Sequence, residues 1–204
     1  MKKHLLLFLS VIFSLSLFAA PKYEFRGQWF TTVNNIDWPK TKATTDANRE
    51  KQKQELIDIL DRLQAGNVNA VCLQVRSLSD ALYASNYEPW AAALTGTRGT
   101  GPGYDPLQFA IDEAHKRGIE LHAWVNPFRV TSSSSEILTD AQIQNLYKAP
   151  TGKTELNPAW ILKYSNGKFT GTIIDPGIPA AREYITNVLM DIVDHYDIEV
   201  HPKS

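Results

Sequence analysis

The sequence has a single cysteine and no surplus of either charge. Its 204 residues include 21 basic and 22 acidic side chains, for a formal net charge of -1. One cysteine cannot form a disulfide within the chain, and it excludes a cysteine-based zinc cluster. Binders of nucleic acids or anionic membranes carry a basic excess, so the charge balance argues against both as partners. With 43% hydrophobic residues, the chain can build a core.

A long apolar run is also absent, because the longest one, Leu5 to Phe18, is too short to span a membrane comfortably. It follows Lys2 and Lys3 and ends in Ala19 and Ala20. A charged start, a short apolar stretch and small residues at the end are typical of a secretory signal peptide. No cysteine stands at the cleavage point to make a lipoprotein. We therefore expect a secreted or periplasmic protein.

The expected division of the chain is a signal peptide at residues 1–19 and one domain at residues 20–204. The alternative is a membrane anchor that is never cleaved. N-terminal sequencing of the protein from the envelope or the medium tests this, and we expect the mature chain to start at Ala20. A chain that still began with Met1 in a membrane fraction would reject the signal peptide.

Strand and helix patterns alternate along the rest of the chain. Apolar, β-branched and aromatic runs predict strands, and apolar residues at helical spacing predict helices. The predicted strands lie near residues 25–33, 69–75 and 119–125, and the helices near 47–65, 105–117 and 179–196. Residues 198–200 would begin a fourth strand. This alternation predicts an α/β fold with a parallel sheet and crossover helices.

The loops that follow the predicted strands are long, whereas those that follow the helices are short. The longest are residues 76–104 and 126–171, with a brief extended piece at 172–174. In α/β barrels, the loops after the strands build the active site. A doubly wound sheet gives the same alternation. However, no Gly-rich dinucleotide fingerprint follows the first strand, and the strand ends are polar and aromatic. We therefore expect the amino-terminal part of a (β/α)₈ TIM-type barrel.

Polar and aromatic side chains share one side of the second and third predicted strands. Side chains alternate along a strand, so the residues on that side are Cys72, Gln74, Arg76, His122, Trp124 and Asn126. Hydrogen-bonding groups beside an indole suit a sugar, whose hydroxyls take the polar groups and whose apolar face stacks on the ring. The alternative is that Gln74 and Arg76 only satisfy polar groups buried at the strand ends.

The loops add further aromatic and acidic side chains with less specific roles. Trp38 and the other loop aromatics are as consistent with packing on the rim as with sugar binding. The loop carboxylates Asp37, Asp80, Glu88 and Asp175 are of a kind that more often caps turns and helices than it catalyses. His122 and His201 lack the spacing of metal ligands. We expect no metal and no cofactor.

Several long blocks of this sequence resemble one known family. The blocks are FRGQWFTTVNNIDWP, LDRLQAGNVNAVCLQVR, DALYASNYEPW, GYDPLQFAIDEAHKRGIELHAWVNPFR and DPGIPAAREYITNVLMDIV. They follow one another, over residues 24–197, as in the glycosyl hydrolase-like family 10, a set of secreted bacterial proteins. The resemblance implies a (β/α)₈-type barrel that acts on glycans. It also implies that the substrate is a peptidoglycan strand or another polysaccharide.

The resemblance also marks individual positions. The matched residues include Trp29, Asp37, Asp80, Tyr83 and Pro127. Asp175-Pro176-Gly177 stands where the family usually has Asn-Pro-Gly. The residues that we expect to bind substrate are Arg26, Trp38, Gln74, Arg76, His122, Trp124, Asn126, Arg129 and Asp175.

The sequence departs from the family pattern at its end. Relatives continue with a strand of the type Asp-Val-Asp-Gly-Ile-His-Phe-Asp-Asp-Tyr, whereas here Asp197-Ile-Glu is followed by Val-His-Pro-Lys-Ser. The paired acids of that strand are the best catalytic candidates, so the catalytic residues of this chain stay unknown. We expect a barrel that is incomplete after about three βα units and the start of a fourth strand.

Three hypotheses follow from the sequence. The first is part of a secreted glycoside hydrolase that is inactive alone, because glycosidic cleavage needs two carboxylates. The second is a glycan-binding remnant without catalysis, and the third is a chain that never folds stably. Open strand edges also predict self-association.

Overall fold

The computed structural model describes residues 24–131, 137–151, 153, 155–165 and 170–198. The predicted signal peptide at residues 1–19 lies outside them and stays a prediction. Within the described ranges, no helix is both long enough and apolar enough to cross a membrane.

Three parallel strands form the central sheet, as predicted. They are β1 (Gly27–Phe30), β2 (Ala70–Arg76) and β3 (Glu120–Val125), in the spatial order β1-β2-β3. Trp29 lies beside Cys72, which in turn lies beside His122. The register shifts between Gln74 and Arg76. The predicted first strand was too long, because the chain leaves the sheet after Phe30 to form the short 3-10 helix η2 (Val33–Asn35).

The three predicted helices are present, and local sequence signals set their starts. They are α2 (Asp46–Ala65), α4 (Pro106–His115) and α6 (Pro179–His195). Asp105 caps α4, because its carboxylate accepts hydrogen bonds from the backbone N–H groups of Leu107 and Gln108. Proline, which favours the first turn of a helix, begins both α4 and α6.

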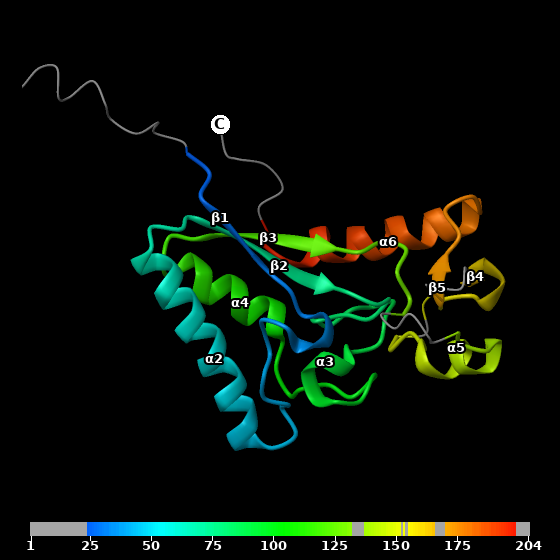
Figure 1. Ribbon diagram of the computed structural model, residues 1–204, viewed down its shortest axis with the longest axis horizontal. Helices are drawn as coiled ribbons and strands as arrows, with labels where there is room; N and C mark the ends of the chain where they lie inside the picture. Colours follow the sequence, from blue (N-terminus) through cyan, green and yellow to red (C-terminus); the bar gives the residue numbers. More distant parts are fainter. Residues whose placement is uncertain (1–23, 132–136, 152, 154, 166–169, 199–204) are drawn as a thin grey trace, which may run out of the picture.

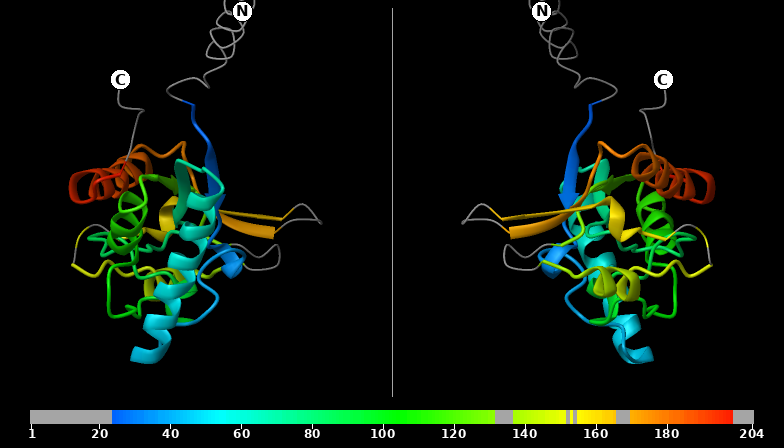
Figure 2. Two further views of the ribbon diagram at one scale, coloured as in Figure 1. Left: turned by 90° about the vertical axis from the view of Figure 1, so that its left-hand side faces the viewer. Right: turned by 90° about the vertical axis from the view of Figure 1, so that its right-hand side faces the viewer.

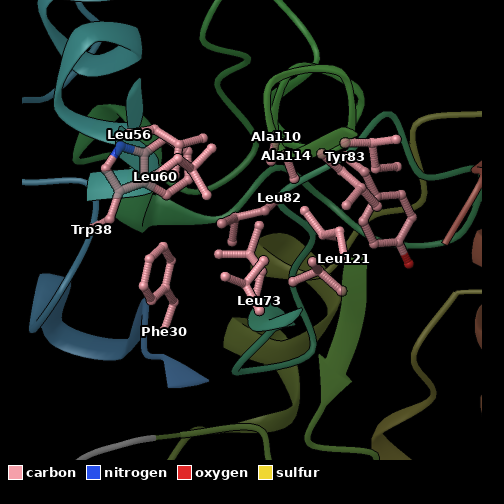
Figure 3. Close-up of a cluster of buried hydrophobic side chains, with 14 of the residues drawn as sticks. Phe30, Trp38, Leu56, Leu60, Leu73, Leu82, Tyr83, Ala110, Ala114 and Leu121 are labelled. Atoms are coloured by element: carbon pink, nitrogen blue, oxygen red, sulfur yellow. The ribbon is translucent and has the colours of Figure 1, made fainter. Parts of the chain in front are cut away.

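One face of the sheet packs against the helices and forms the main core (Figure 3). Val71, Leu73, Val75 and Leu121 alternate along β2 and β3 toward that face. Leu56 and Leu60 of α2 and Ala110 and Ala114 of α4 cover them, and all are buried. Periodicities of two in the strands and about 3.6 in the helices meet at this core.

Helices α2, α4 and α6 all contribute to the core on this face of the sheet. Ile192 near the end of α6 belongs to the core that α2 and α4 build, and Tyr196 and Ile198 pack against it. A doubly wound sheet would have helices on both faces. Figure 1 shows α6 running alongside β3, with α2 and α4 on one side of the sheet. The fold is therefore the predicted α/β type, with three consecutive βα units of a barrel.

The long loop predicted at residues 126–171 contains structure that the prediction missed. It holds α5 (Asp140–Leu146), the 3-10 helix η3 (Pro158–Trp160) and β4 (Ile161–Ser165), which pairs antiparallel with β5 (Thr170–Ile174). The extended piece predicted at 172–174 is the end of β5. These elements lie beyond the carboxyl ends of the parallel strands, and the β4–β5 hairpin projects from the body (Figures 1 and 2).

A second hydrophobic cluster lies under this insertion. Ile143 and Tyr147 pack there with Ile174 and with Tyr184 and Val188 of α6. Helix α6 thus contributes to both clusters, with its first half in the second one and its end in the main core.

The start of a fourth strand, expected at residues 198–200, falls mostly outside the described residues. Ile198 is described, and it lies outside any strand. In the described part of the sheet, β1 and β3 form the edges. Self-association through such edges stays a prediction.

Candidate functional site

The side of the sheet opposite the helices, here called the inner face, carries the aromatic residues that the sequence singled out. The rings of Trp29 and Trp124 meet edge to face, with centroids 5.1 Å apart. Phe25 meets His122 in the same way at 5.6 Å. Trp29 is 58% exposed, and His122 and Trp124 are half-buried. Large aromatic surfaces are therefore accessible on this face.

Polar groups lie beside the tryptophan pair. The indole N–H of Trp124 donates to Asn126 Oδ1 at 3.0 Å, and the Asn126 amide donates to the carbonyl of Ser77 at 3.4 Å. His122 Nε2 lies 3.3 Å from Glu120 Oε2. Burial raises the pKa of the neighbouring Cys72 thiol, so this side chain stays neutral. The structure thus brings together His122, Trp124 and Asn126, as the sequence predicted.

Gln74 points to the same side but is enclosed. Its side-chain oxygen accepts hydrogen bonds from the backbone N–H groups of Thr32 and Val33, each at 3.0 Å. Gln74 is 1% exposed. Gln74 therefore holds the chain that follows β1. This agrees with the alternative in which it only satisfies polar groups buried at the strand ends.

Arg76 is fully buried at the end of β2 and is paired with Glu88. Its Nε and Nη2 donate to the two Glu88 oxygens at 2.7 and 2.6 Å. Its remaining donors reach the carbonyls of Asn126 and Pro127 and the hydroxyl of Ser79. Burial alone lowers the pKa of Arg76, but the Glu88 carboxylate outweighs it and the pKa is raised. Arg76 thus joins the ends of β2 and β3 and has no donor left for a sugar.

Two of the predicted residues lie away from this face. Trp38 is fully buried in the main core, and its indole N–H donates to the carbonyl of Gln52 at 3.0 Å. Arg26 precedes β1, at the amino-terminal end of the sheet. Its guanidinium donates to the carbonyl of Asn67 and pairs with Glu24. Both residues were expected to bind substrate because they match the family pattern. Such a match does not distinguish a residue of the core from one that binds a ligand.

Arg129 and Asp175 lie on the insertion side. The Arg129 side chain is exposed, and its backbone forms an isolated antiparallel bridge with Ile173. Asp175 Oδ1 accepts the backbone N–H of Gly177 at 2.7 Å, as turn residues do.

A pocket of about 310 Å³ lies between the loops that follow β1 and β2. Its charged lining residues are Lys42, Asp80 and Arg98. Asn34 and Asn35 also line it, and both have a left-handed backbone with φ of 53°. Of these residues, the sequence singled out only Asp80. The adjacent asparagines were the available signal, since Asn tolerates this conformation better than most residues do.

The loop carboxylates are already engaged by hydrogen-bond donors of this chain. Asp37 accepts the backbone N–H of Thr31 at 2.8 Å, and Asp80 accepts from the Arg98 guanidinium at 3.2 Å. Glu88 is bound by Arg76, as described above. Across the described ranges, no three His, Cys, Asp or Glu side chains are grouped to hold a metal ion.

Comparison with known proteins agrees with the resemblance seen in the sequence. Residues 24–201 match the model of the family described as Glycosyl hydrolase-like 10. The chain belongs to this family. Within the glycosyl hydrolase-like 10 proteins, it is 40% identical over 176 residues to Glycosyl hydrolase YngK of Bacillus subtilis (strain 168). It is 37% identical over 178 residues to Glycosyl hydrolase DigH of Escherichia coli (strain K12).

The matches cover 86% and 85% of this chain but only 32% and 40% of these two relatives. The chain therefore spans only about a third to two-fifths of the length of the curated relatives that it matches. Among solved structures, it is similar to a noncanonic maltogenic alpha-amylase, AmyB, from Thermotoga neapolitana, with a TM-score of 0.46 and 14% identity. That match covers 85% of this chain and 36% of the amylase. The family assignment supports a glycoside hydrolase-like function.

Proposed function

We propose that this chain supplies a sugar-binding wall of a secreted glycoside hydrolase that acts on a polysaccharide, such as the glycan strands of peptidoglycan. The observation that carries the proposal is the accessible pair of Trp29 and Trp124 on the inner face. His122 and Asn126 provide polar groups beside it. An indole binds the apolar face of a sugar ring, and the polar groups hydrogen-bond its hydroxyls.

Binding of a peptide-free peptidoglycan glycan fragment tests this proposal. Burying a large apolar side chain contributes about 1.5–3 kcal/mol, and only part of each indole is free to be covered. We therefore expect Trp29→Ala and Trp124→Ala each to weaken binding about tenfold. Isothermal titration calorimetry on the purified chain measures the dissociation constants.

Met190→Ala is the control, because Met190 is an exposed apolar side chain, 45% exposed against 58% for Trp29. Met190 lies on α6, away from the tryptophan pair. We expect its replacement to change the dissociation constant less than twofold. Equal losses in the Met190 and Trp29 variants, or no loss in either tryptophan variant, would contradict the proposal. Sedimentation at the same concentrations shows whether any variant differs in self-association instead.

Binding without hydrolysis is the second candidate function. The observation that favours it is that Asp80 and Glu88, the buried loop carboxylates, are both paired with arginines. Because each carboxylate is occupied by a guanidinium, neither is free to contact a glycosidic oxygen. The hydrolysis experiment in the Discussion separates the two candidates.

A further inference from the structure

The pocket beside Lys42 and Arg98 has the chemistry of an anion site. We propose that it binds the carboxylate of an acidic sugar residue in the glycan. This inference rests on the proposed function and specifies the substrate as a carboxylated glycan. The pocket is formed by residues that follow β1 and β2, such as Thr32 and Ser77, at the carboxyl ends of neighbouring strands. Barrel enzymes bind their substrates at that end.

The charge of the pocket favours an anion. Its charged lining residues are Lys42, Arg98 and Asp80, so two positive charges and one negative charge leave a formal surplus of +1. The Asp80 side chain is 3% exposed and the Arg98 side chain is 16% exposed. The carboxylate is therefore hidden behind the guanidinium, which holds it through Nε and Nη2 at 3.3 and 3.2 Å. The accessible charge is mostly positive.

Both cations are positioned before any ligand binds. Lys42 Nζ donates to Asn35 Oδ1 and to the carbonyl of Ala93. An ammonium has three N–H donors, so one remains. The Arg98 guanidinium stacks on the ring of Tyr147, with its Cζ atom 4.5 Å from the centroid. Its Nη1 takes no part in the pairing with Asp80. One donor from each cation is thus left for a carboxylate.

The backbone around the pocket is held in an unfavourable conformation. Asn34, Asn35 and Ser79 have φ of 53°, 53° and 54°, which non-glycine residues rarely adopt. Such strain persists where surrounding contacts enforce it, and it is concentrated at binding sites. The Asn35 side chain bonds Lys42 directly, so the strained turn sets the position of the ammonium. Burial also lowers the pKa of Lys42, and a bound anion would offset that effect.

A chain of hydrogen bonds connects the pocket with the tryptophan pair. The Trp124 indole donates to Asn126, and Asn126 donates to the carbonyl of Ser77, which lines the pocket. A glycan could therefore place one sugar on the inner face and the next, acidic sugar at the pocket, along the same wall of the barrel. This connection makes the pocket part of a glycan site rather than an isolated anion site.

Amide chemical shifts of the ¹⁵N-labelled chain test the proposal. The probes are N-acetylmuramic acid, whose carboxylate is on a lactyl ether, glucuronic acid, and the carboxyl-reduced form of each. We expect at least one acid, and neither reduced form, to shift the amide signals of Ala93 and Gly96. A response to N-acetylmuramic acid indicates peptidoglycan, and one to glucuronic acid indicates a uronate polysaccharide. Equal responses to the acid and reduced forms, or no response to either acid, would overturn the proposal.

Variants of Lys42 test whether its ammonium binds the carboxylate of the acid. Lys42→Met keeps the length of the side chain and removes its charge, and we expect it to weaken binding of the acid about three- to tenfold. Lys42→Arg should retain most of the affinity. A Lys42→Met variant that bound the acid as well as the parent would also overturn the proposal. If the acids move Ala93 and Gly96 while the tryptophan variants do not affect glycan binding, only the proposed function fails.

Discussion

Replacing Arg76 by alanine is expected to lower the free energy of unfolding by about 3–5 kcal/mol. The substitution leaves the Glu88 carboxylate buried without its cation, since both side chains are fully buried. It also removes the donors that reach the carbonyls of Asn126 and Pro127 at the end of β3. For a chain of this size, the loss corresponds to a fall in melting temperature on the order of 10 °C.

Urea denaturation followed by circular dichroism measures this change. Glu50→Ala is the control, because the Glu50 side chain is 69% exposed in its ion pair with Lys53 and surface pairs contribute about 0–1 kcal/mol. Tyr184→Phe removes one hydrogen bond to Glu88, and we expect a loss of about 1 kcal/mol. A parent chain without a cooperative transition would support the hypothesis that it never folds stably. An Arg76→Ala loss no larger than that of Glu50→Ala would contradict the role of the buried pair.

A double variant separates two causes of the Arg76→Ala loss: the unpaired Glu88 charge and the lost side-chain packing. Arg76→Met with Glu88→Leu removes both charges and keeps apolar volume. Buried pairs can often be replaced in this way at little cost, whereas removing one partner is strongly destabilising. We expect the double variant to be more stable than Arg76→Ala.

The second large effect concerns hydrolysis. We propose that the purified chain does not release reducing sugars from peptidoglycan strands. Cleavage uses two carboxylates roughly 5–10 Å apart, and the described loop acids are held by Arg76, Arg98 or backbone N–H groups. Joining the chain to the part of the Bacillus subtilis relative outside the match should raise the rate at least about 10²- to 10⁴-fold, the contribution of one general acid or base.

A reducing-sugar assay on both proteins measures this difference. In the joined protein, Asp175→Asn is expected to leave most of the rate intact, because Asp175 caps a turn. The opposite result is informative: if the chain alone cleaves the glycan and loses that activity on Asp175→Asn or Asp80→Asn, those loop acids are the catalysts.

The sheet and its helices could be predicted because their signals are local. The apolar alternation in β2 and the proline and aspartate before α4 act within a few residues of the elements they specify. The strand parity also placed His122 and Trp124 on one side correctly. The insertion was missed because its second cluster depends on distant partners. Tyr147 and Ile143 are buried in a cluster that also needs Ile174 and residues of α6.

The roles of individual site residues depended on partners that spacing does not reveal. Strand parity put Arg76 and Gln74 on the inner side, but Glu88, twelve residues further on, takes the guanidinium. The carboxamide of Gln74 is likewise enclosed by a turn forty-odd residues earlier. The position of the Lys42 ammonium is set by its hydrogen bonds to the Asn35 side chain and the Ala93 carbonyl. None of these pairings follows a helical or strand period, so composition and periodicity could not predict them.

Helix α6 makes the two hydrophobic clusters mechanically dependent on each other. Its 17 residues form a rod about 25 Å long, held at Tyr184 and Val188 by the insertion and at Ile192 by the sheet. Close-packed interiors transmit strain. Ile174 of β5 belongs to the second cluster and Ile161 of β4 packs against it, so we expect a displacement of this hairpin to be transmitted along α6 to the core under the sheet.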